Sequence, residues 1–344
     1  MASAYTRMTP QGWNARKKLP LPGSGLRTHH ANYAEQDIPA RNRGYPSPSR
    51  ALSPPYFSSP TTPASRTGML AGGTLGFTHW IPTATIPNSR NYTDTVVLGF
   101  WDIWEKNTAD IRLELSTSSS SDKGTVAKAS AWAGTSEYSI GATYLKVSCT
   151  TSQVFGMDWG THQIDMDPDP LPGTKNCRIR FFREYVCPPV VVVWLNRLDM
   201  SSSTKWCVNV TASHVSTTGF MLNVNTWNES CVYGVGVTWI AYSPKSECVW
   251  VWNGILGGGL RGSPMSKRGM KGIELFPEQK TKVKTTPTVL MGISGFDVDN
   301  SGDLRVRLDR ADVTDWGMYW SFTGVFMDTQ LDNAVGQYLA FALP

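Results

Sequence analysis

Apolar and polar residues alternate along much of this chain. The clearest runs are "YSIGATYLKV" from Tyr138 and "YGVGVTWIAY" from Tyr233, and a period of two predicts a strand with one buried face. Pro188-Pro189 and Pro287 stand just before apolar runs, where a missing N–H removes no bond from a central ladder. No stretch shows a convincing amphipathic helical period, so the pattern predicts an all-β protein.

The same pattern occurs three times. Each copy opens on an apolar run: "VVLGFWDIW" from Val96, "VVVVWLNRLDM" from Val190 and "VLMGISGFDVD" from Val289. A turn, a second strand, a glycine and an aromatic tip follow, and then comes an alternating strand. Three aromatic residues hold the same place in that last strand, where we expect a repeated buried anchor: Tyr144, Trp239 and Tyr338. The starting valines are 94 and 99 residues apart, which indicates repeats of about 100 residues.

These repeats predict three tandem antiparallel β-sandwiches of about six strands each. We place the three repeats at residues 69–150, 151–245 and 246–344. Residues 1–68 hold ten of the 22 prolines and nine Lys or Arg against two acidic residues, which predicts a disordered basic tail. Such a tail could contact membranes or nucleic acid or be phosphorylated at its Ser-Pro steps, but a solvated linker is the simpler interpretation.

Charge and hydropathy exclude several classes of protein. The chain beyond residue 68 has 23 basic and 25 acidic residues, which argues against a strong nucleic-acid footprint on the folded part. No secretory signal and no apolar run of transmembrane length is visible. We therefore expect a cytoplasmic or non-classically secreted protein. The six cysteines show no CxxC spacing, so free thiols are expected and the disulfide alternative stays open.

Motifs for metals and catalysis are weak. "DVDNSGDLRVRL" from Asp297 resembles a calcium loop but ends in Leu308 instead of Glu, so a polar hairpin turn is favoured. "DMDPDP" from Asp165 clusters carboxylates in a loop, and glycosidase-type chemistry there is a minor alternative. "GILGGGLRGSP" from Gly254 is interpreted as a flexible linker. The histidines lack zinc spacing. No enzyme, metal or cofactor is predicted.

Two arginines precede an aromatic residue by about 20 positions. Arg112 precedes Trp132, and Arg305 precedes Phe326. On adjacent strands these pairs could converge at one end of a sandwich. A guanidinium fork and an aromatic face are the groups that a sugar needs for its hydroxyls and its C–H face. The alternative is an arginine lying over a surface aromatic.

The second repeat carries a wider set of matching motifs. These are "RFFREYVCPPVVVVWLNRLD", "NVTASHVSTTGF", "NTWNES" and "VYGVGVTWIAYS". Together they resemble the H-type lectin family, known from invertebrate agglutinins and the C-terminal part of discoidins. The resemblance covers about 60 residues in this copy and is fainter in the other two. It implies a six-stranded sandwich assembled as a trimer, which binds N-acetylgalactosamine-type sugars in clefts between protomers.

The resemblance also implies site residues. In the family a strand Arg, a Trp and the polar residue after it hold the sugar, helped by an acidic residue from the next protomer. The first repeat keeps Arg112 and Trp132 but has Ala133. The second keeps Trp227 and Asn228 but has Cys207 in place of Arg. The third keeps Arg305 but has Phe326 and Met327. Tyr138 and Tyr233 complete the candidate sugar-binding set, and the candidate cross-repeat acids are Asp165, Asp167 and Asp169.

The leading hypothesis is therefore a non-enzymatic lectin for galactose or N-acetylgalactosamine-type glycans, with cell adhesion as its expected role. Three repeats in one chain predict a monomeric pseudo-trimer with different clefts. The competing hypothesis is a structural or protein-interaction module whose sugar sites have decayed, as Cys207, Ala133 and Met327 suggest.

Overall fold

Every regular element in the described part of the chain is a β-strand. The computed structural model describes residues 70–88, 94–121, 124–135, 138–148, 156–166, 173–244, 250–257, 270–276, 286–323 and 330–342. The strands fall into three segments of six. Segment 1 contains β1 (Leu70–Thr78), β2 (Thr83–Ile86), β3 (Asp94–Glu105), β4 (Ile111–Ser121), β5 (Gly124–Ala131) and β6 (Tyr138–Ser148). The all-β class is confirmed, whereas the predicted tail, residues 1–68, lies outside the described residues.

The other two segments repeat this order. Segment 2 contains β7 (Met157–Asp165), β8 (Thr174–Arg180), β9 (Val190–Met200), β10 (Trp206–Ser213), β11 (Gly219–Asn225) and β12 (Val232–Tyr242). Segment 3 contains β13 (Trp250–Gly257), β14 (Met270–Leu275), β15 (Thr288–Val298), β16 (Leu304–Ala311), β17 (Gly317–Thr323) and β18 (Leu331–Ala342). The strands of each segment fall within one predicted repeat, but the repeat boundaries as domain limits stay a prediction.

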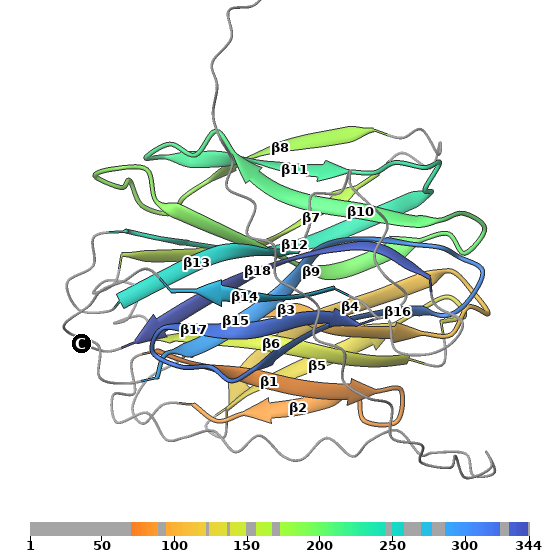
Figure 1. The fold of residues 1–344 in the computed structure, drawn as a ribbon, viewed down its shortest axis with the longest axis horizontal. Helices are drawn as coiled ribbons and strands as arrows, with labels where there is room; N and C mark the ends of the chain where they lie inside the picture. The colour runs from red at the N-terminus through yellow and green to blue at the C-terminus, as the bar shows by residue number, and fades with distance from the viewer. Residues whose placement is uncertain are drawn as a thin grey trace, which may run out of the picture. The chain divides into compact units, whose positions relative to one another are not determined.

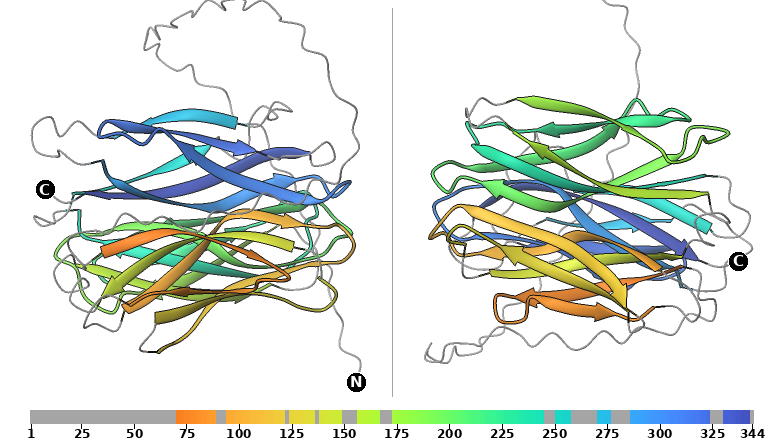
Figure 2. Two further views of the ribbon diagram at one scale, coloured as in Figure 1. Left: turned by 90° about the horizontal axis from the view of Figure 1, so that it is seen from below. Right: turned by 180° about the vertical axis from the view of Figure 1, so that it is seen from behind.

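Each sheet is shared by two segments (Figures 1 and 2). The three antiparallel sheets have the orders β1-β6-β3-β16-β17-β14, β2-β5-β4-β9-β12-β7 and β13-β18-β15-β10-β11-β8. Adding six to every strand number, and counting on from β18 to β1, converts the first order into the second read backwards, and a further six gives the third. Each segment therefore pairs with both others, and the three segments close a ring. The predicted six-stranded unit is confirmed, because each segment gives three strands to one sheet and three to another. The sequence did not predict that the neighbouring segments complete both sheets.

A glycine and an aromatic residue face each other at the same place in every segment. Gly73 pairs with Tyr144, Gly160 with Trp239 and Gly254 with Tyr338. These aromatic rings are buried, as predicted. They lie so close to the neighbouring strand that a Cβ on Gly160 would be 2.8 Å from the Trp239 ring. The glycines are needed because the ring occupies the space of a side chain.

A central cluster joins the three segments. It contains matching residues of β3, β9 and β15 (Val97, Val192 and Leu290) and of β6, β12 and β18 (Leu145, Ile240 and Leu339). Trp194 also lies in this cluster, while the matching positions hold Gly99 and Gly292. A Cβ at Gly99 would be 2.7 Å from the Trp194 Cβ, and one at Gly292 would be 2.4 Å from its ring. One tryptophan therefore fills the centre because its two counterparts have no side chain.

The three loops after β3, β9 and β15 are linked in a closed circuit. The Asn107 side chain donates to the Asn300 carbonyl over 2.7 Å, and the Asn300 side chain donates to the Ser202 carbonyl over 3.0 Å. The Ser202 N–H in turn donates to Asp110 over 3.0 Å. Since Asp110 and Asn107 lie in one loop, the hydrogen bonds return to segment 1.

Two local predictions were wrong. Gly254–Gly257, expected in a flexible linker, belong to β13, because the main chain there pairs with β18. The "DVDNSGDLRVRL" turn is not a hairpin, because β15 and β16 belong to different sheets. The turn instead connects two sheets, with the Ser301 N–H donating to Asp299 over 2.9 Å.

The predicted free thiols are found at the four described cysteines, which are Cys177, Cys187, Cys207 and Cys231. Cys149 and Cys248 lie outside the described residues. Within the described ranges, no helix is long and apolar enough to span a membrane.

Candidate functional site

The candidate sites lie where two segments meet within a sheet. Junction 1 joins β4 of segment 1 to β9 of segment 2, junction 2 joins β10 to β15, and junction 3 joins β16 to β3. Arg112, Cys207 and Arg305 occupy one matching position in the first strand of each pair. Their partners across the ladder are Asp199, Asp297 and Trp104 respectively. These three strand positions therefore lie at contacts between segments.

Arg112 is the centre of junction 1. Its Nε donates to Asp199 over 3.1 Å, its Nη2 to Asp110 over 2.9 Å and its Nη1 to the Ala133 carbonyl over 3.1 Å. The guanidinium also lies over the Tyr233 ring, with Cζ 5.9 Å from the ring centroid. Arg112 thus connects a carboxylate of segment 2 to the loop that carries Trp132.

A second arginine covers the predicted tryptophan. Cζ of Arg197, on β9, lies 5.3 Å from the Trp132 ring centroid, within the range of a cation–π contact. Arg197 also contacts Asp199 at 3.6 Å and Asp165 at 3.7 Å. Asp199 therefore lies between two guanidinium groups. The Arg112 cluster combines donors, acceptors and aromatic faces and consists of Arg112, Trp132, Arg197, Asp199 and Tyr233.

The polar network continues along the junction. Arg197 Nη1 donates to Gln163 over 3.5 Å, and Gln163 donates to Glu114 over 3.0 Å. Alternate residues of a strand face the same side, which brings Arg112 and Glu114 of β4 beside Arg197 and Asp199 of β9. This face can form many hydrogen bonds to a polyhydroxyl ligand.

Junction 2 is closed by its own side chains. Asp297 accepts from Cys207 over 3.2 Å, from the Trp227 indole over 2.8 Å and from Asn228 over 3.4 Å. Burial, followed by the Asp297 charge, raises the pKa of the Cys207 thiol, so it stays neutral. A sugar at Trp227 and Asn228 would have to replace bonds that are already made.

Junction 3 has a buried carboxylate. Asp102 is 1% exposed and lies 3.9 Å from Arg305 and from Arg307. Burial raises the pKa of Asp102 from 3.8 to about 6, although both arginines lower it. Phe326 lies outside the described residues, so the predicted Arg305–Phe326 pair is not placed.

The two predicted tyrosines lie at different junctions. Tyr233 belongs to segment 2 and reaches Arg112 of segment 1. Tyr138 belongs to segment 1 and pairs with Glu105 of β3, the strand that forms junction 3. It is therefore beside junction 3 and not part of the Arg112 cluster, because the start of β6 lies next to the end of β3.

One of the three predicted acids is placed. Asp165, on β7, has a side chain that is 89% exposed and lies near Arg197, while Asp167 and Asp169 lie outside the described residues. Asp199 and Arg197 were not predicted from the sequence, although they contact Arg112 and Trp132 from segment 2. Alternation in "VVVVWLNRLDM" places both residues on one face, but only the register between segments shows that this face meets Arg112.

No described group of three or more His, Cys, Asp or Glu side chains could hold a metal ion. The described side chains of the Arg112 cluster offer hydrogen-bond donors and acceptors, charge and aromatic faces.

Comparison with known proteins identifies the class of this fold. A family model of the H-type lectin domain matches residues 176–242 and 281–341. These two parts of the chain are similar to the H-type lectin domain, so the resemblance predicted from the sequence is confirmed for them.

Two solved structures of discoidin II from Dictyostelium discoideum are similar to this chain. The recombinant protein is 12% identical with a TM-score of 0.24, and the match covers 47% of this chain and 82% of discoidin II. The wild-type protein is 14% identical with a TM-score of 0.23, covering 44% and 74%. A search of curated proteins finds no match.

Proposed function

We propose that this protein is a carbohydrate-binding lectin whose working site is junction 1. The observation that carries the proposal is the ion pair of Arg112 with Asp199, which joins two segments beside Trp132. Lectin-domain sequence in segments 2 and 3 supports the same class. Binding needs no chemical step, and the protein is proposed to act without catalysis.

The ligand is proposed to be a galactose or N-acetylgalactosamine-type glycan. Arg197, Gln163 and Asp165 offer donors and acceptors for ring hydroxyls. Trp132 and Tyr233 offer aromatic surface for the C–H face of the ring. Since Arg197 lies over Trp132, sugar binding at that face requires the Arg197 side chain to move aside, which is a rotamer change of a partly exposed side chain.

A single site of this kind has limited affinity. A dissociation constant on the order of 1 mM corresponds to about 4 kcal/mol, and clustered glycans would raise the apparent affinity through multivalency. A role in cell adhesion would depend on such clustering.

Arg112 and Arg183 provide a matched pair of variants. Each guanidinium forms an ion pair through Nε, to Asp199 over 3.1 Å and to Asp158 over 2.8 Å, but Arg183 lies outside junction 1. On a glycan array we expect Arg112→Lys to lose at least about tenfold in signal, because lysine lacks the planar fork, and Arg183→Lys to bind as the wild type does. Equal signals for the two variants, or no bound glycan for the wild type, would contradict the proposal.

The second candidate is a structural or protein-interaction module. The observation that favours it is the closure of junction 2, where three donors already occupy Asp297. It predicts no glycan binding at any junction and a protein partner that binds the Arg112→Lys variant unchanged.

A further inference from the structure

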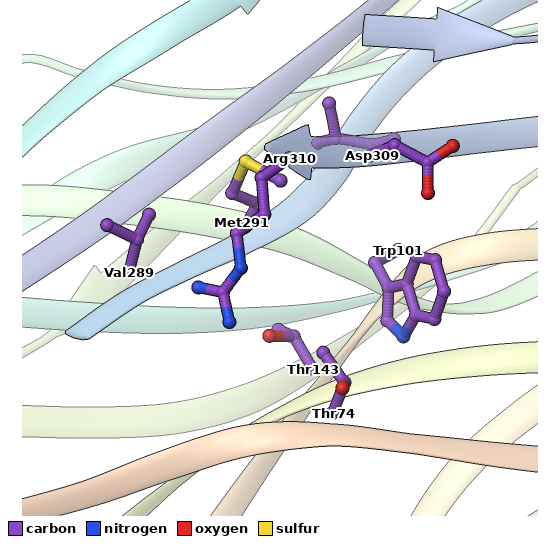
Figure 3. A pocket seen from close by; sticks show the side chains of 8 residues that line it. Thr74, Trp101, Thr143, Val289, Met291, Asp309 and Arg310 are labelled. Carbon is purple, nitrogen blue, oxygen red and sulfur yellow. The ribbon is translucent and has the colours of Figure 1, made fainter. Parts of the chain in front are cut away.

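A cavity between segments 1 and 3 lies apart from the Arg112 cluster. It has a volume of about 170 Å³. Its lining comes from β1, β3, β6, β15 and β16: Thr74, Trp101, Thr143, Val289, Met291, Leu308, Asp309 and Arg310 (Figure 3). Neither the family match nor the proposed lectin site assigns a role to it.

Arg310 occupies an unusual position for a charged residue. Alternate residues of β16 face the interior, namely Leu304, Val306 and Leu308, and Arg310 continues this series. The matching residues of the other segments are Thr117 and Ala212. The residue as a whole is exposed, but desolvation lowers its pKa, so its guanidinium is partly desolvated. A partly desolvated guanidinium gains from an anionic partner.

The neighbouring carboxylate does not supply that partner. Asp309 faces the opposite side of β16, where Arg307 Nε donates to its two oxygens over 2.7 and 2.9 Å. In Figure 3 the Asp309 carboxylate points away from the Arg310 guanidinium. Among the described residues, no carboxylate forms an ion pair with Arg310.

Hydroxyl groups lie beneath the guanidinium. Figure 3 shows Arg310 pointing toward Thr143 and Thr74. Thr238 and Gln337 hold the positions that match Thr143 in segments 2 and 3, and each forms a hydrogen bond to a neighbouring segment. Thr238 donates to the Leu98 carbonyl over 2.5 Å, and Gln337 accepts from the Val193 N–H over 3.1 Å. Thr143 instead has a 3.5 Å contact to Gly73 within its own segment. No bridge from Thr143 to segment 3 is found in the described part of the chain, and the cavity lies at this place.

The lining fits a small organic anion better than a bare ion. The lining combines the donors of Arg310, Thr143 and Thr74 with the apolar side chains of Val289, Met291 and Leu308 and the Trp101 ring. A bare oxyanion would gain nothing from the apolar side chains, and a chain of nucleic acid or a lipid surface is too large for about 170 Å³. A hydroxylated ring with one carboxylate matches both the donors and the apolar part of the lining.

We propose that this cavity binds the carboxylate of an acidic monosaccharide unit, held by Arg310 in a bidentate pair and by the hydroxyls of Thr143 and Thr74. The site is separate from junction 1, so the protein would bind neutral and acidic sugars in two different places. It does not depend on the proposed function of the Arg112 cluster.

The test is calorimetric titration of the full chain with galacturonate, with galactose as the neutral counterpart and acetate as the bare carboxylate. We expect galacturonate to bind the wild type, Arg310→Gln to weaken it at least about tenfold and Arg310→Lys to weaken it severalfold. Arg178→Gln, which changes an exposed arginine of β8, should have no effect. Thr143→Val should weaken binding severalfold and provides a second variant if Arg310→Gln does not fold.

Four results with the ligands and variants above would overturn the proposal, and a fifth comes from Arg112→Lys. They are undetectable binding of galacturonate to the wild type, an affinity unchanged in Arg310→Gln, an equal loss in Arg178→Gln, and acetate binding as tightly as galacturonate. Galacturonate binding that persists in Arg112→Lys separates this site from junction 1. If that variant abolishes galacturonate binding, the cavity is not the site.

Discussion

Arg112, Cys207 and Arg305 occupy one position of three matching strands, and the side chain present there sets the character of each junction. Arg112 bridges two segments and leaves Trp132 partly open to solvent. Cys207 instead adds a third donor to a carboxylate that already accepts from Trp227 and Asn228. At junction 3, Arg305 lies near a carboxylate that is almost fully buried. Among the described residues, junction 1 therefore combines partly exposed charged groups with the Trp132 ring.

Asp102 makes the stability of the protein depend on pH. Burial raises its pKa from 3.8 to about 6, so between these values the folded protein binds more protons than the unfolded chain. Its contribution to the free energy of unfolding therefore falls as the pH rises from about 4 to about 6 and is constant above. A shift of about two pKa units corresponds to on the order of 3 kcal/mol.

Urea unfolding at about pH 4, 5, 6 and 7 tests this dependence. Asp102→Asn does not titrate at this position. We therefore expect its free energy of unfolding to rise relative to that of the wild type as the pH rises from about 4 to about 6. A difference that is independent of pH, or one that changes in the opposite direction, would show that Asp102 keeps an ordinary pKa.

The loops after β3, β9 and β15 matter at the scale of elements, because they hold the strands of each junction in register. Asn300 lies in one of these loops and donates to the Ser202 carbonyl. We expect Asn300→Ala to lower the free energy of unfolding by about 1 kcal/mol, the usual contribution of one hydrogen bond.

Hydrogen exchange gives the local measurement for Asn300→Ala. Amide exchange should be accelerated more in the loops after β9 and β15 than in the central strands. Lys128→Ala, on the exposed face of β5, is the control and should change neither stability nor exchange. Equal effects of the two substitutions would mean that the loop circuit contributes nothing.

The strands could be predicted from the sequence because alternation is a local signal. Tyr144, Trp239 and Tyr338 were correctly identified as repeated buried positions. The composition of the sheets could not be predicted in the same way, since the pairing of β4 with β9 joins residues far apart in the chain. Asp199 and Arg197 were missed for the same reason, because only the pairing of β4 with β9 brings them to Arg112 and Trp132.

At the scale of the whole molecule, Trp194 makes the three segments different from one another at their shared centre. Its indole donates to the Gln337 carbonyl over 3.0 Å, and Gly99 and Gly292 leave the space for its ring. Three identical units could not build this packing, because three tryptophans would collide and three glycines would leave a void.

Gly292→Ala tests the central packing. Its Cβ would lie 2.4 Å from the Trp194 ring, so we expect the free energy of unfolding to fall by about 1–3 kcal/mol. In a Trp194→Leu background the same substitution should cost less, which urea unfolding of the four proteins would show as a coupling energy. Strictly additive effects would mean that the two residues do not compete for one space.

The central claim is that glycan binding belongs to junction 1 and not to junction 2. The most direct measurement compares Trp132→Ala with Trp227→Ala on a glycan array carrying galactose and N-acetylgalactosamine structures. The account predicts that the wild type and Trp227→Ala bind these glycans and that Trp132→Ala loses at least about tenfold in signal. Equal binding by the two variants, or a loss confined to Trp227→Ala, would contradict it.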